Sequence, residues 1–303
     1  MPCSDLTVAV IHYQTPDLLG RCLARLLPAA PGARIVVIDA GDLAPLPPDW
    51  YSPGVELVRV ANHSFAATVN AGLESCRTAY FAHMNADVLV ERRTFTDLLG
   101  TLDADPAAGM AGPLPVDARG VLQDQGLPYR WWQWRAALDP SAWHHTTRRA
   151  GRSVRGVKAP WLSGCLQVVR TAAAHAAGPL DESQRFTNEE TDWCHRMRDR
   201  GFDLILTDSP VTHLGGSSTP AHPAFLVEGL RGGMVVTLRH SAAWRAELQR
   251  LAVWGWASLA SFLSPKQPVR RAAREVQRIF RERAWDEPVF GATLAEPLVP
   301  KAA

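Results

Sequence analysis

The chain has 303 residues, of which 47% are hydrophobic and 20% are charged, and its formal net charge is +2. This composition is typical of a globular protein with one large domain or one domain and an appendage, and the small net charge argues against a general affinity for nucleic acid. No apolar run reaches the roughly 18 residues that a membrane span needs, and the first residues lack the basic start and apolar core of a signal peptide. The five cysteines are scattered without a CxxC pair, which indicates reduced thiols, so we expect a cytoplasmic protein.

The N-terminal part alternates predicted strands with predicted helices. Leu6–Ile11 and Arg34–Asp39 are short, apolar and rich in β-branched residues, as buried strands are. Val55–Val60 alternates as a half-buried strand, and Phe81–Val90 is a further apolar strand that carries an acid towards its end. Helical spacing follows or precedes these strands in three segments: Asp17–Leu27, Asn62–Cys76 and Thr94–Leu102. This alternation predicts an α/β fold with a doubly wound, mainly parallel sheet.

Polar side chains follow several of these predicted strands. His12 follows the first strand, Asp39 ends the second, and Asn85 and Asp87 interrupt the apolar run Phe81–Val90. In open α/β sheets, ligands gather at the carboxyl ends of the strands. Carboxylate oxygens there are suited to a hard metal ion that bridges the phosphates of a nucleotide.

The middle of the chain has a different composition. Pro113–Pro160 is rich in Gly, Pro, Arg and Trp, and Trp161–Val169 is strand-like. Asp181–Phe202 contains a predicted helix, and Leu204–Thr207 is a short predicted strand that leads into the Gly/Ser-containing segment Val211–Thr219.

The last part of the chain is predicted to be helical. Phe225–Leu263 has helical character, and Pro265–Trp285 contains seven basic and two acidic residues, a net charge of +5. Apolar residues of the second segment fall on one helical face, so it is a basic amphipathic helix. This helix could pack as part of an appendage, form a homodimer, or lie on an anionic membrane surface.

Seven segments carry a family resemblance, and they occur in the order of the family's motifs: His12–Leu19, Ile35–Ala40, Asn62–Gly72, Met84–Asp87, Trp161–Arg170, Gly178–Arg196 and His213–Ser218. On these segments the chain resembles a family 2 glycosyltransferase of the GT-A fold, and within that family the rhamnosyltransferase-like branch. The resemblance implies a Rossmann-like, mainly parallel mixed sheet flanked by helices. We expect a GT-A domain at 1–220, with a nucleotide-binding half at 1–112 and an acceptor half at 113–220, and a helical appendage at 221–303.

Four positions depart from the family pattern. Ser64 replaces a glycine, Ala40 replaces an asparagine, and Ala86 replaces a proline within the metal motif. Glu190 stands where the family usually has its catalytic aspartate, in the run Glu189–Asp192.

The resemblance implies a nucleotide site and a metal site. Asp39 would accept a hydrogen bond from the base N–H, or it could be a solvated loop acid or a cap for the next segment. His12 and Thr15 would line the same pocket, although His12 is as readily a packed histidine. Asn70 belongs to the same nucleotide-sugar set, and Asn85 would contact the ribose or an outer-shell water.

The metal is expected to be Mn²⁺ or Mg²⁺. Asp87 would bind it, unless this residue is a helix N-cap. His213 is the second candidate ligand, and its imidazole suits Mn²⁺ better than Mg²⁺.

The resemblance also implies a general base and an acceptor side. Glu190 is the candidate base that deprotonates the acceptor hydroxyl, with Asp192 or Glu189 as alternatives, and crowded carboxylates would raise one pKa. These acids could instead be surface charges that interact with the helix dipole.

Residues of the WLSG run would flank the acceptor. Trp161, Ser163 and Gly164 are its candidates, together with Glu189; an ordinary packed strand is the alternative. The tryptophans at 131, 132, 134 and 143 could stack on a sugar or a lipid-linked acceptor, or fill a small core.

The expected function is the inverting, metal-dependent transfer of one sugar. The donor would be a dTDP-, UDP- or GDP-linked sugar, with L-rhamnose or another deoxysugar as the specific prediction. The acceptor would be a saccharide, a lipid-linked molecule or a natural product. The alternatives are a catalytically silent relative that binds a nucleotide sugar and a nucleotidyltransferase, although His12–Leu19 offers no Gly-rich phosphate loop. We expect a cytoplasmic location that includes the inner membrane face.

Overall fold

The computed structural model describes residues 3–41, 54–123, 152–153, 156–215 and 222–299. The chain forms two compact units. Unit 1 contains residues 1–60, 68–179 and 193–218, and unit 2 contains residues 61–67, 180–192 and 219–303. The tryptophans at 131, 132, 134 and 143, for which an acceptor contact and a small core were both left open, fall outside the described residues.

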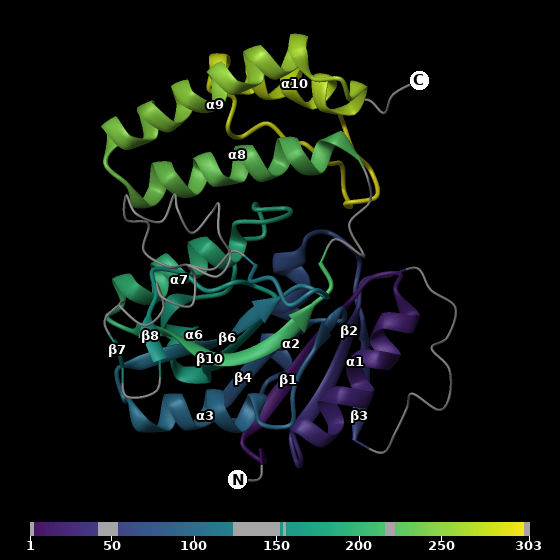
Figure 1. Ribbon diagram of the computed structural model, residues 1–303, viewed down its shortest axis with the longest axis vertical. Helices are drawn as coiled ribbons and strands as arrows, with labels where there is room; N and C mark the ends of the chain where they lie inside the picture. Colours follow the sequence, from purple (N-terminus) through teal and green to yellow (C-terminus); the bar gives the residue numbers. More distant parts are fainter. Residues whose placement is uncertain (1–2, 42–53, 124–151, 154–155, 216–221, 300–303) are drawn as a thin grey trace. The chain divides into compact units, whose positions relative to one another are not determined.

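Unit 1 is built on one mixed sheet with the strand order β3-β2-β1-β4-β9-β6-β10-β8-β7, and β5 pairs with β10 (Figure 1). The first four strands in this order are parallel, and β9 runs antiparallel to both of its neighbours. The strands are β1 (Leu6–His12), β2 (Arg34–Asp39), β3 (Val55–Arg59), β4 (Tyr80–Asn85), β5 (Val88–Leu89), β6 (Ala108–Val116), β7 (Arg152–Ser153), β8 (Gly156–Lys158), β9 (Leu166–Arg170) and β10 (Asp203–His213). The predicted α/β class and mixed sheet are therefore confirmed.

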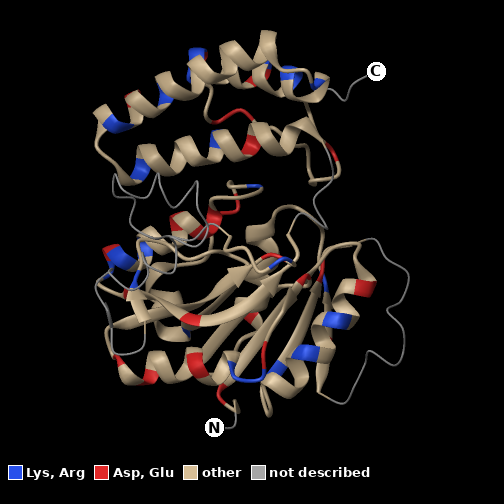
Figure 2. Ribbon diagram, in the orientation of Figure 1, with Lys and Arg blue, Asp and Glu red and all other residues tan. Residues whose placement is uncertain are grey.

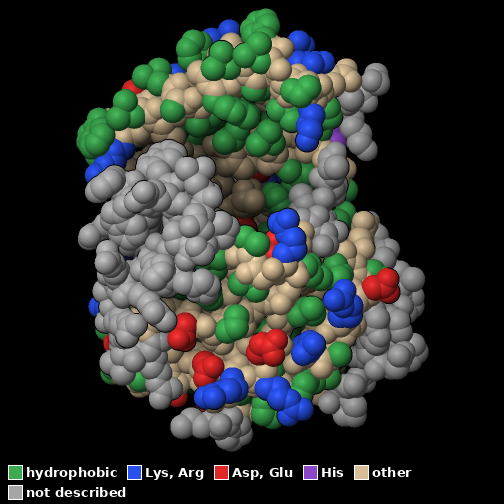
Figure 3. Space-filling model, viewed as in Figure 1, with side chains coloured by type: hydrophobic (Ala, Val, Ile, Leu, Met, Phe, Trp, Pro, Cys, Tyr) green, Lys and Arg blue, Asp and Glu red, His purple; other side chains and the backbone are tan. Residues whose placement is uncertain are grey.

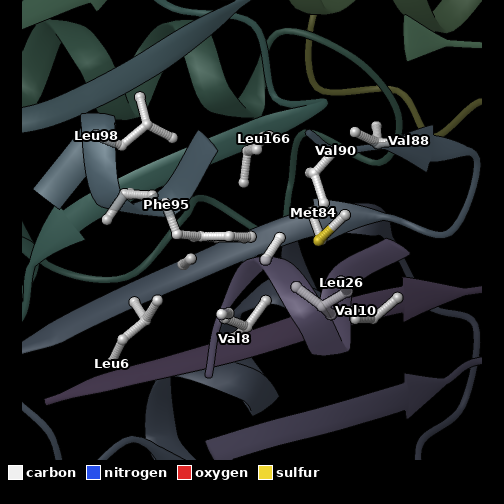
Figure 4. Packing of buried hydrophobic residues seen from close by; sticks show 14 of the residues in the cluster. Leu6, Val8, Val10, Leu26, Met84, Val88, Val90, Phe95, Leu98 and Leu166 are labelled. Carbon is white, nitrogen blue, oxygen red and sulfur yellow. The ribbon is translucent and has the colours of Figure 1, made fainter. Parts of the chain in front are cut away.

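One face of the sheet packs against α1 (Pro16–Ala29) and α3 (Thr94–Ala104) (Figure 4). Alternate residues of each strand point to this face, because side chains along a strand alternate in direction. The buried residues that meet there include Leu6, Val8 and Val10 from β1, Met84 from β4, Leu26 from α1, and Phe95 and Leu98 from α3. The long apolar strands of the sequence are thus explained by burial.

Helix α2 (Phe65–Ser75) approaches the sheet at Gly72. A Cβ atom there would lie 2.6 Å from the Cβ atom of Ala9 on β1, so only glycine permits this approach. Helix α6 (Thr171–Ala177) lies in unit 1. Helix α7 (Glu189–Asp199) begins in unit 2, and its residues from Trp193 onwards belong to unit 1.

Unit 2 contains α8 (Pro223–His240), α9 (Ala243–Leu263) and α10 (Gln267–Glu282). The apolar face predicted for the basic amphipathic helix is buried in the core of this unit, through Ala272, Ala273, Val276, Ile279 and Phe280. That face is therefore occupied by packing within the unit. Among the described residues, no helix has the length and apolar character needed to cross a membrane.

Two predicted strands have different bounds in the structure. The run Phe81–Val90 is divided into β4 and β5, because the chain turns at Ala86 and Asp87 and β5 then pairs antiparallel with β10. The strand predicted at Leu204–Thr207 continues to His213, since its second part pairs with both β6 and β5. All five cysteines are buried free thiols, in agreement with the sequence prediction.

Candidate nucleotide and metal site, and the acid motif

The first cluster lies at the carboxyl ends of β1 and β2. These parallel strands place His12 directly opposite Asp39, and both side chains are fully buried. The Nδ1 atom of His12 lies 3.0 Å from Oδ1 of Asp39, and the backbone N–H of Thr15 donates to Nε2 of His12 at 3.1 Å. The ring is therefore a neutral tautomer that donates from Nδ1 to the carboxylate, and it fixes the orientation of Asp39.

One oxygen of Asp39 is left for a ligand. Oδ1 accepts from His12 and from the backbone N–H of Gly41, at 3.0 Å each. Oδ2 is buried and has no hydrogen-bond partner among the described residues. Because a buried, unpaired carboxylate oxygen costs free energy, such an atom is a candidate for binding a donor group. The interpretation of Asp39 as a solvated loop acid is excluded by its burial.

The second cluster joins Asp87 to His213. Asp87 lies in the turn between β4 and β5, and the backbone N–H of Leu214 donates to the carbonyl oxygen of Asp87 at 3.1 Å. The pairing of β5 with β10 places His213 opposite Val88, the residue after Asp87. As a result, Nε2 of His213 lies 3.4 Å from Oδ1 of Asp87. Asp87 is not a helix N-cap, since α3 begins only at Thr94.

Gln123 sets the tautomer of His213. Its Nε2 donates to the carbonyl oxygen of His213 at 2.8 Å, and its Oε1 lies 2.6 Å from Nδ1 of the same residue. The amide oxygen can only accept, so Nδ1 of His213 carries the hydrogen. In the neutral ring, Nε2 then presents a lone pair to the carboxylate of Asp87.

This arrangement fits a divalent cation. Two acceptor atoms that face each other at 3.4 Å repel unless a proton or a cation lies between them, and this separation is long for a charge-assisted hydrogen bond. A ligating histidine normally donates its other N–H to a neighbouring acceptor, as His213 does to Gln123. Among the described residues no group of three or more His, Cys, Asp or Glu side chains could hold a metal, so a metal here would take its remaining ligands from substrate and water.

Apart from Glu189, which belongs to unit 2, the other predicted nucleotide and acceptor residues lie in unit 1. Asn70 is buried on α2, and Asn85, at the end of β4, has a buried Oδ1 without a partner among the described residues. Ser64, which belongs to unit 2, caps α2 by accepting from the N–H of Ala67 at 3.0 Å. The serine that replaces the family's glycine therefore has a local structural role.

The segment Trp161–Gly164 is held by a buried polar chain. Gln167 donates to the carbonyl oxygen of Leu162 at 2.7 Å and lies 3.0 Å from Nε2 of His83. Burial lowers the pKa of His83 to about 4, so its ring is neutral at physiological pH. Within the segment, Ser163 accepts from the N–H of Cys165 at 3.3 Å. The candidates Trp161, Ser163 and Gly164 thus lie in the hydrogen-bonded segment directly before β9.

The acid motif forms the start of α7. Thr187 and Asn188 precede the helix with φ values of 64° and 72°, a left-handed conformation that is strained for residues other than glycine and is found most often at functional sites. Glu189 and Glu190 follow, and each has a buried Oε2 without a hydrogen-bond partner among the described residues. They are therefore not solvated surface charges.

Burial has a direct electrostatic effect on both glutamates. It raises the pKa of Glu189 well above that of an ordinary glutamate, and the charges of Glu190 and Glu228 raise it further. Burial also raises the pKa of Glu190, although backbone N–H groups at Asn188, Glu190 and Thr191 act in the opposite direction. A carboxylate with a raised pKa is a stronger proton acceptor once it is ionised.

Asp192 is bound differently. Its Oδ1 lies 2.9 Å from Nε2 of His240 and 3.4 Å from Nη1 of Arg239, both in the last turn of α8. This carboxylate is paired within unit 2, whereas Glu189 and Glu190 keep an unpaired oxygen.

Helix α8 supports the segment that carries the acids. The side chain of Glu228 accepts from the backbone N–H of Arg185 at 3.0 Å, and it pairs with Arg231, whose guanidinium also donates to the carbonyl oxygen of Ser183 at 3.1 Å. Gly232 lies so close that a Cβ atom there would be 2.5 Å from Oε1 of Gln184. Asn188 donates to the carbonyl oxygen of Gly229 at 3.0 Å.

These supporting residues were not found from the sequence. The glycines at 229, 232 and 233 have the i, i+3, i+4 spacing of one helical face, and this spacing was the available signal. Gln123 had no such signal, because nothing local in the sequence relates it to His213.

Comparisons with known proteins agree with the fold. The glycosyl transferase family 2 model matches residues 7–176, more than half of the chain, and the chain belongs to that family. The pre-mycofactocin glycosyltransferase of Mycobacterium tuberculosis is 25% identical over 186 residues, which cover 60% of this chain and 37% of the relative. The chain thus matches little more than a third of that relative's length.

Solved structures share the GT-A fold at low sequence identity. The mannosyltransferase PcManGT from Pyrobaculum calidifontis, in complex with GDP-Man and Mn²⁺, has a TM-score of 0.59 and 15% identity, and the match covers 94% of this chain and 88% of that chain. GalNAc-T7, solved with UDP, GalNAc and Mn²⁺, has a TM-score of 0.59 and 14% identity, with 93% and 56% covered. TarS from S. aureus, in complex with UDP-GlcNAc, has a TM-score of 0.58 and 13% identity, with 91% and 80% covered.

Proposed function

We propose that this chain is an inverting, metal-dependent glycosyltransferase that moves one sugar from a nucleotide-diphosphate donor to a hydroxyl group. The observation that carries the proposal is the pair of acceptor atoms on Asp87 and His213, 3.4 Å apart, with the tautomer of His213 fixed by Gln123. Family membership supports the same activity. Two of the similar structures were solved with Mn²⁺, which supports Mn²⁺ or Mg²⁺ as the cofactor.

In this proposal, Asp87 and His213 hold the metal. When bound, the metal stabilises the negative charge that develops on the leaving nucleoside diphosphate. Asp39 accepts a hydrogen bond from the base through its unpaired Oδ2, and His12 acts only by orienting that carboxylate. Asn85 and Asn70 contribute polar groups to the same donor site.

Glu190 is the proposed base. As the acceptor hydroxyl attacks the anomeric carbon, the carboxylate takes the hydroxyl proton, the new C–O bond forms, and the bond to the diphosphate breaks with its electron pair on the phosphate oxygen. The raised pKa and unpaired oxygen of Glu190 favour it over Asp192, which is paired with His240. Trp161, Ser163 and Gly164 are proposed for the acceptor side.

The proposal extends to the identity of the donor sugar and to the class of acceptor. A deoxysugar donor such as dTDP-L-rhamnose rests on the motif resemblance alone, and UDP- and GDP-linked sugars are the competing donors, with precedents in the ligands of the similar structures. The relative named for pre-mycofactocin supports a small-molecule or natural-product acceptor.

The proposal is tested by measuring the hydrolysis and transfer of dTDP-, UDP- and GDP-sugars with and without Mn²⁺. Asp87→Ala is expected to reduce turnover at least about 100-fold, because metal assistance is worth several kcal/mol. Asp208→Ala is the matched control, since Asp208 is an exposed acid on the same strand as His213. Metal-independent turnover, or an unaffected Asp87→Ala variant, would contradict the proposal.

A second candidate function is favoured by one observation, the glutamate at position 190. A catalytically silent relative would bind nucleotide sugars without transferring them, because the carboxylate of Glu190 is displaced by one methylene from that of the family's aspartate. Tight donor binding with no transfer to a broad panel of acceptors, and transfer gained by Glu190→Asp, would support this alternative.

A further inference from the structure

Helix α9 presents a continuous apolar surface to solvent. Six of its eight exposed large side chains recur at helical spacing along one side, and they form what we call the α9 stripe: Trp244, Leu248, Leu251, Leu259, Phe262 and Leu263. The other two, Trp254 and Trp256, flank this side. Phe262 and Leu263 are 81% and 76% exposed. Apolar surface that extends over a whole helix is unusual on a monomeric protein and marks an interaction site.

The opposite side of the same helix is already used. Ala246, Ala257 and Ser261 are buried, and Val253 and Ala260 pack against the hydrophobic core of unit 2. The small residues thus face the core, and the largest apolar residues face outwards. Packing within unit 2 therefore explains only the buried side of α9. The exposed side is the one that a partner can contact.

The ends of the stripe are positively charged. Arg245 lies next to Trp244, with its guanidinium 5.2 Å from the centroid of the indole ring, and Lys266, Arg270 and Arg274 follow Leu263. These four cations form no ion pair with the described residues. Residues 251–264 between them carry no charge at all. The nearby acid Glu247 is paired with Arg250 and Arg283.

Figure 2 shows the basic residues spread along α9 and α10, and Figure 3 shows hydrophobic side chains gathered over the same helices with Lys and Arg among them. An apolar stripe with cations at its ends is complementary to an anionic lipid surface. Apolar side chains enter the boundary between headgroups and acyl chains, and the cations meet lipid phosphates. Tryptophan, present at 244, 254 and 256, favours this interfacial depth.

A second copy of the chain fits this surface less well. Pairing two α9 stripes would bring the cations of one copy close to those of the other, and like charges at an interface oppose association. The charge pattern therefore selects the lipid surface over self-association.

We propose that the α9 stripe, with Arg245, Lys266, Arg270 and Arg274, binds the surface of an anionic lipid bilayer, with α9 lying in the plane of that surface. This surface lies wholly within unit 2 and does not depend on the proposed glycosyl transfer. A membrane contact was one of three roles left open for the basic helix α10, but the apolar face of α10 is buried in unit 2, so the contact is assigned to its neighbour α9.

The test is co-sedimentation of the full chain with phosphatidylcholine vesicles that either contain or lack phosphatidylglycerol. The wild type is expected to sediment with the anionic vesicles. The triple variant Leu259→Gln, Phe262→Gln, Leu263→Gln is expected to lose at least about 100-fold in affinity, since it removes three large apolar groups from the contact. The matched control Leu298→Gln changes an exposed leucine elsewhere in unit 2 and is expected to bind as the wild type does.

A second variant separates charge from apolar contact. Lys266→Ser with Arg274→Ser is expected to weaken binding to anionic vesicles about 10- to 30-fold, because each cation near such a surface contributes about fivefold. Thermal melting checks that each variant is folded. The proposal is overturned if the wild type sediments with neither vesicle, or if the triple variant binds as the wild type does. It is also overturned if gel filtration shows a wild-type dimer that the triple variant converts to a monomer.

Discussion

The strand ends of unit 1 and the helix start of unit 2 use buried carboxylates in opposite ways. In unit 1, Asp39 and Asp87 each lie beside a histidine whose other ring nitrogen is also bonded. In unit 2, the buried Oε2 atoms of Glu189 and Glu190 have no such hydrogen-bonding neighbour among the described residues, and burial raises the pKa of both side chains. In our proposal, the first arrangement holds carboxylates that bind ligands, and the second produces groups that exchange protons. The difference teaches that the partner of a buried acid, rather than its burial, decides which of these it can do.

The largest effect is expected at the acid motif that begins α7. Glu190→Gln removes the proposed base but keeps the shape of the side chain, so kcat should fall by about 10²- to 10⁴-fold with little change in donor affinity. Glu182→Gln, an exposed glutamate in the preceding segment, is the control and should retain wild-type turnover. If Asp192→Asn abolishes turnover while Glu190→Gln does not, the base has been assigned to the wrong residue.

A smaller effect is expected at Asp39, which ends strand β2. In Asp39→Asn, the amide oxygen can still accept from His12 and Gly41, but the amide N–H₂ now faces the ligand. Affinity for UDP and dTDP should fall about 10- to 100-fold, the cost of losing a hydrogen bond to a charged group. Calorimetric titration measures this loss. CDP, whose base offers an acceptor at the same ring position, should not lose affinity, and an equal loss for all three nucleotides would contradict a direct contact with the base.

The support of the acid motif by α8 can be tested at its glycines. Gly232→Ala places a Cβ atom 2.5 Å from Gln184, so it should displace the segment before α7, lower kcat about 10-fold and destabilise the fold by about 1–3 kcal/mol. Gly255→Ala on α9 is the matched control, because its Cβ atom would meet nothing within 4 Å, and it should stabilise by about 0.5–1 kcal/mol. Wild-type turnover in Gly232→Ala would mean that α8 does not position the acids.

The smallest effect concerns how the stability of the fold changes with pH. The folded state holds the proton of Glu189 more tightly than the unfolded chain does, so this group stabilises the fold below the pKa of an unfolded glutamate, about 4.3, and that contribution is lost as the pH rises through the raised value. The amide of Glu189→Gln does not ionise, so this variant does not lose stability in this way as the pH rises. Its melting temperature should exceed that of the wild type by a few degrees at pH 8, and the gain should shrink towards pH 4. An equal difference at both pH values would show that Glu189 is not protonated above its usual range.

Much of the strand-end region could be predicted from the sequence, because strand periodicity places its residues. His12 and Asp39 end neighbouring parallel strands, so their proximity follows once the register is known. The proximity of Asp87 and His213 was expected from motifs, not from local pattern, since 126 residues separate them and the pairing of β5 with β10 brings them together.

The helical region was less predictable. Helical character was evident in Phe225–Leu263, but the direction of each face depends on tertiary packing. The basic helix α10 turned its apolar face inwards, while the more apolar α9 placed its largest side chains outside. The contacts of Arg185 with Glu228, Gly291 and Ala292 also join segments far apart in the chain, and no local signal marks such contacts.

The central claim is that Asp87 and His213 share a divalent cation, and Mn²⁺ binding measured by electron paramagnetic resonance in the presence of UDP tests it most directly. The wild type should bind Mn²⁺, His213→Ala should bind at least about 100-fold more weakly, and Gln123→Leu should bind about 10- to 100-fold more weakly because it removes the bond that fixes the histidine tautomer. Equal Mn²⁺ affinity in all three proteins would contradict the account.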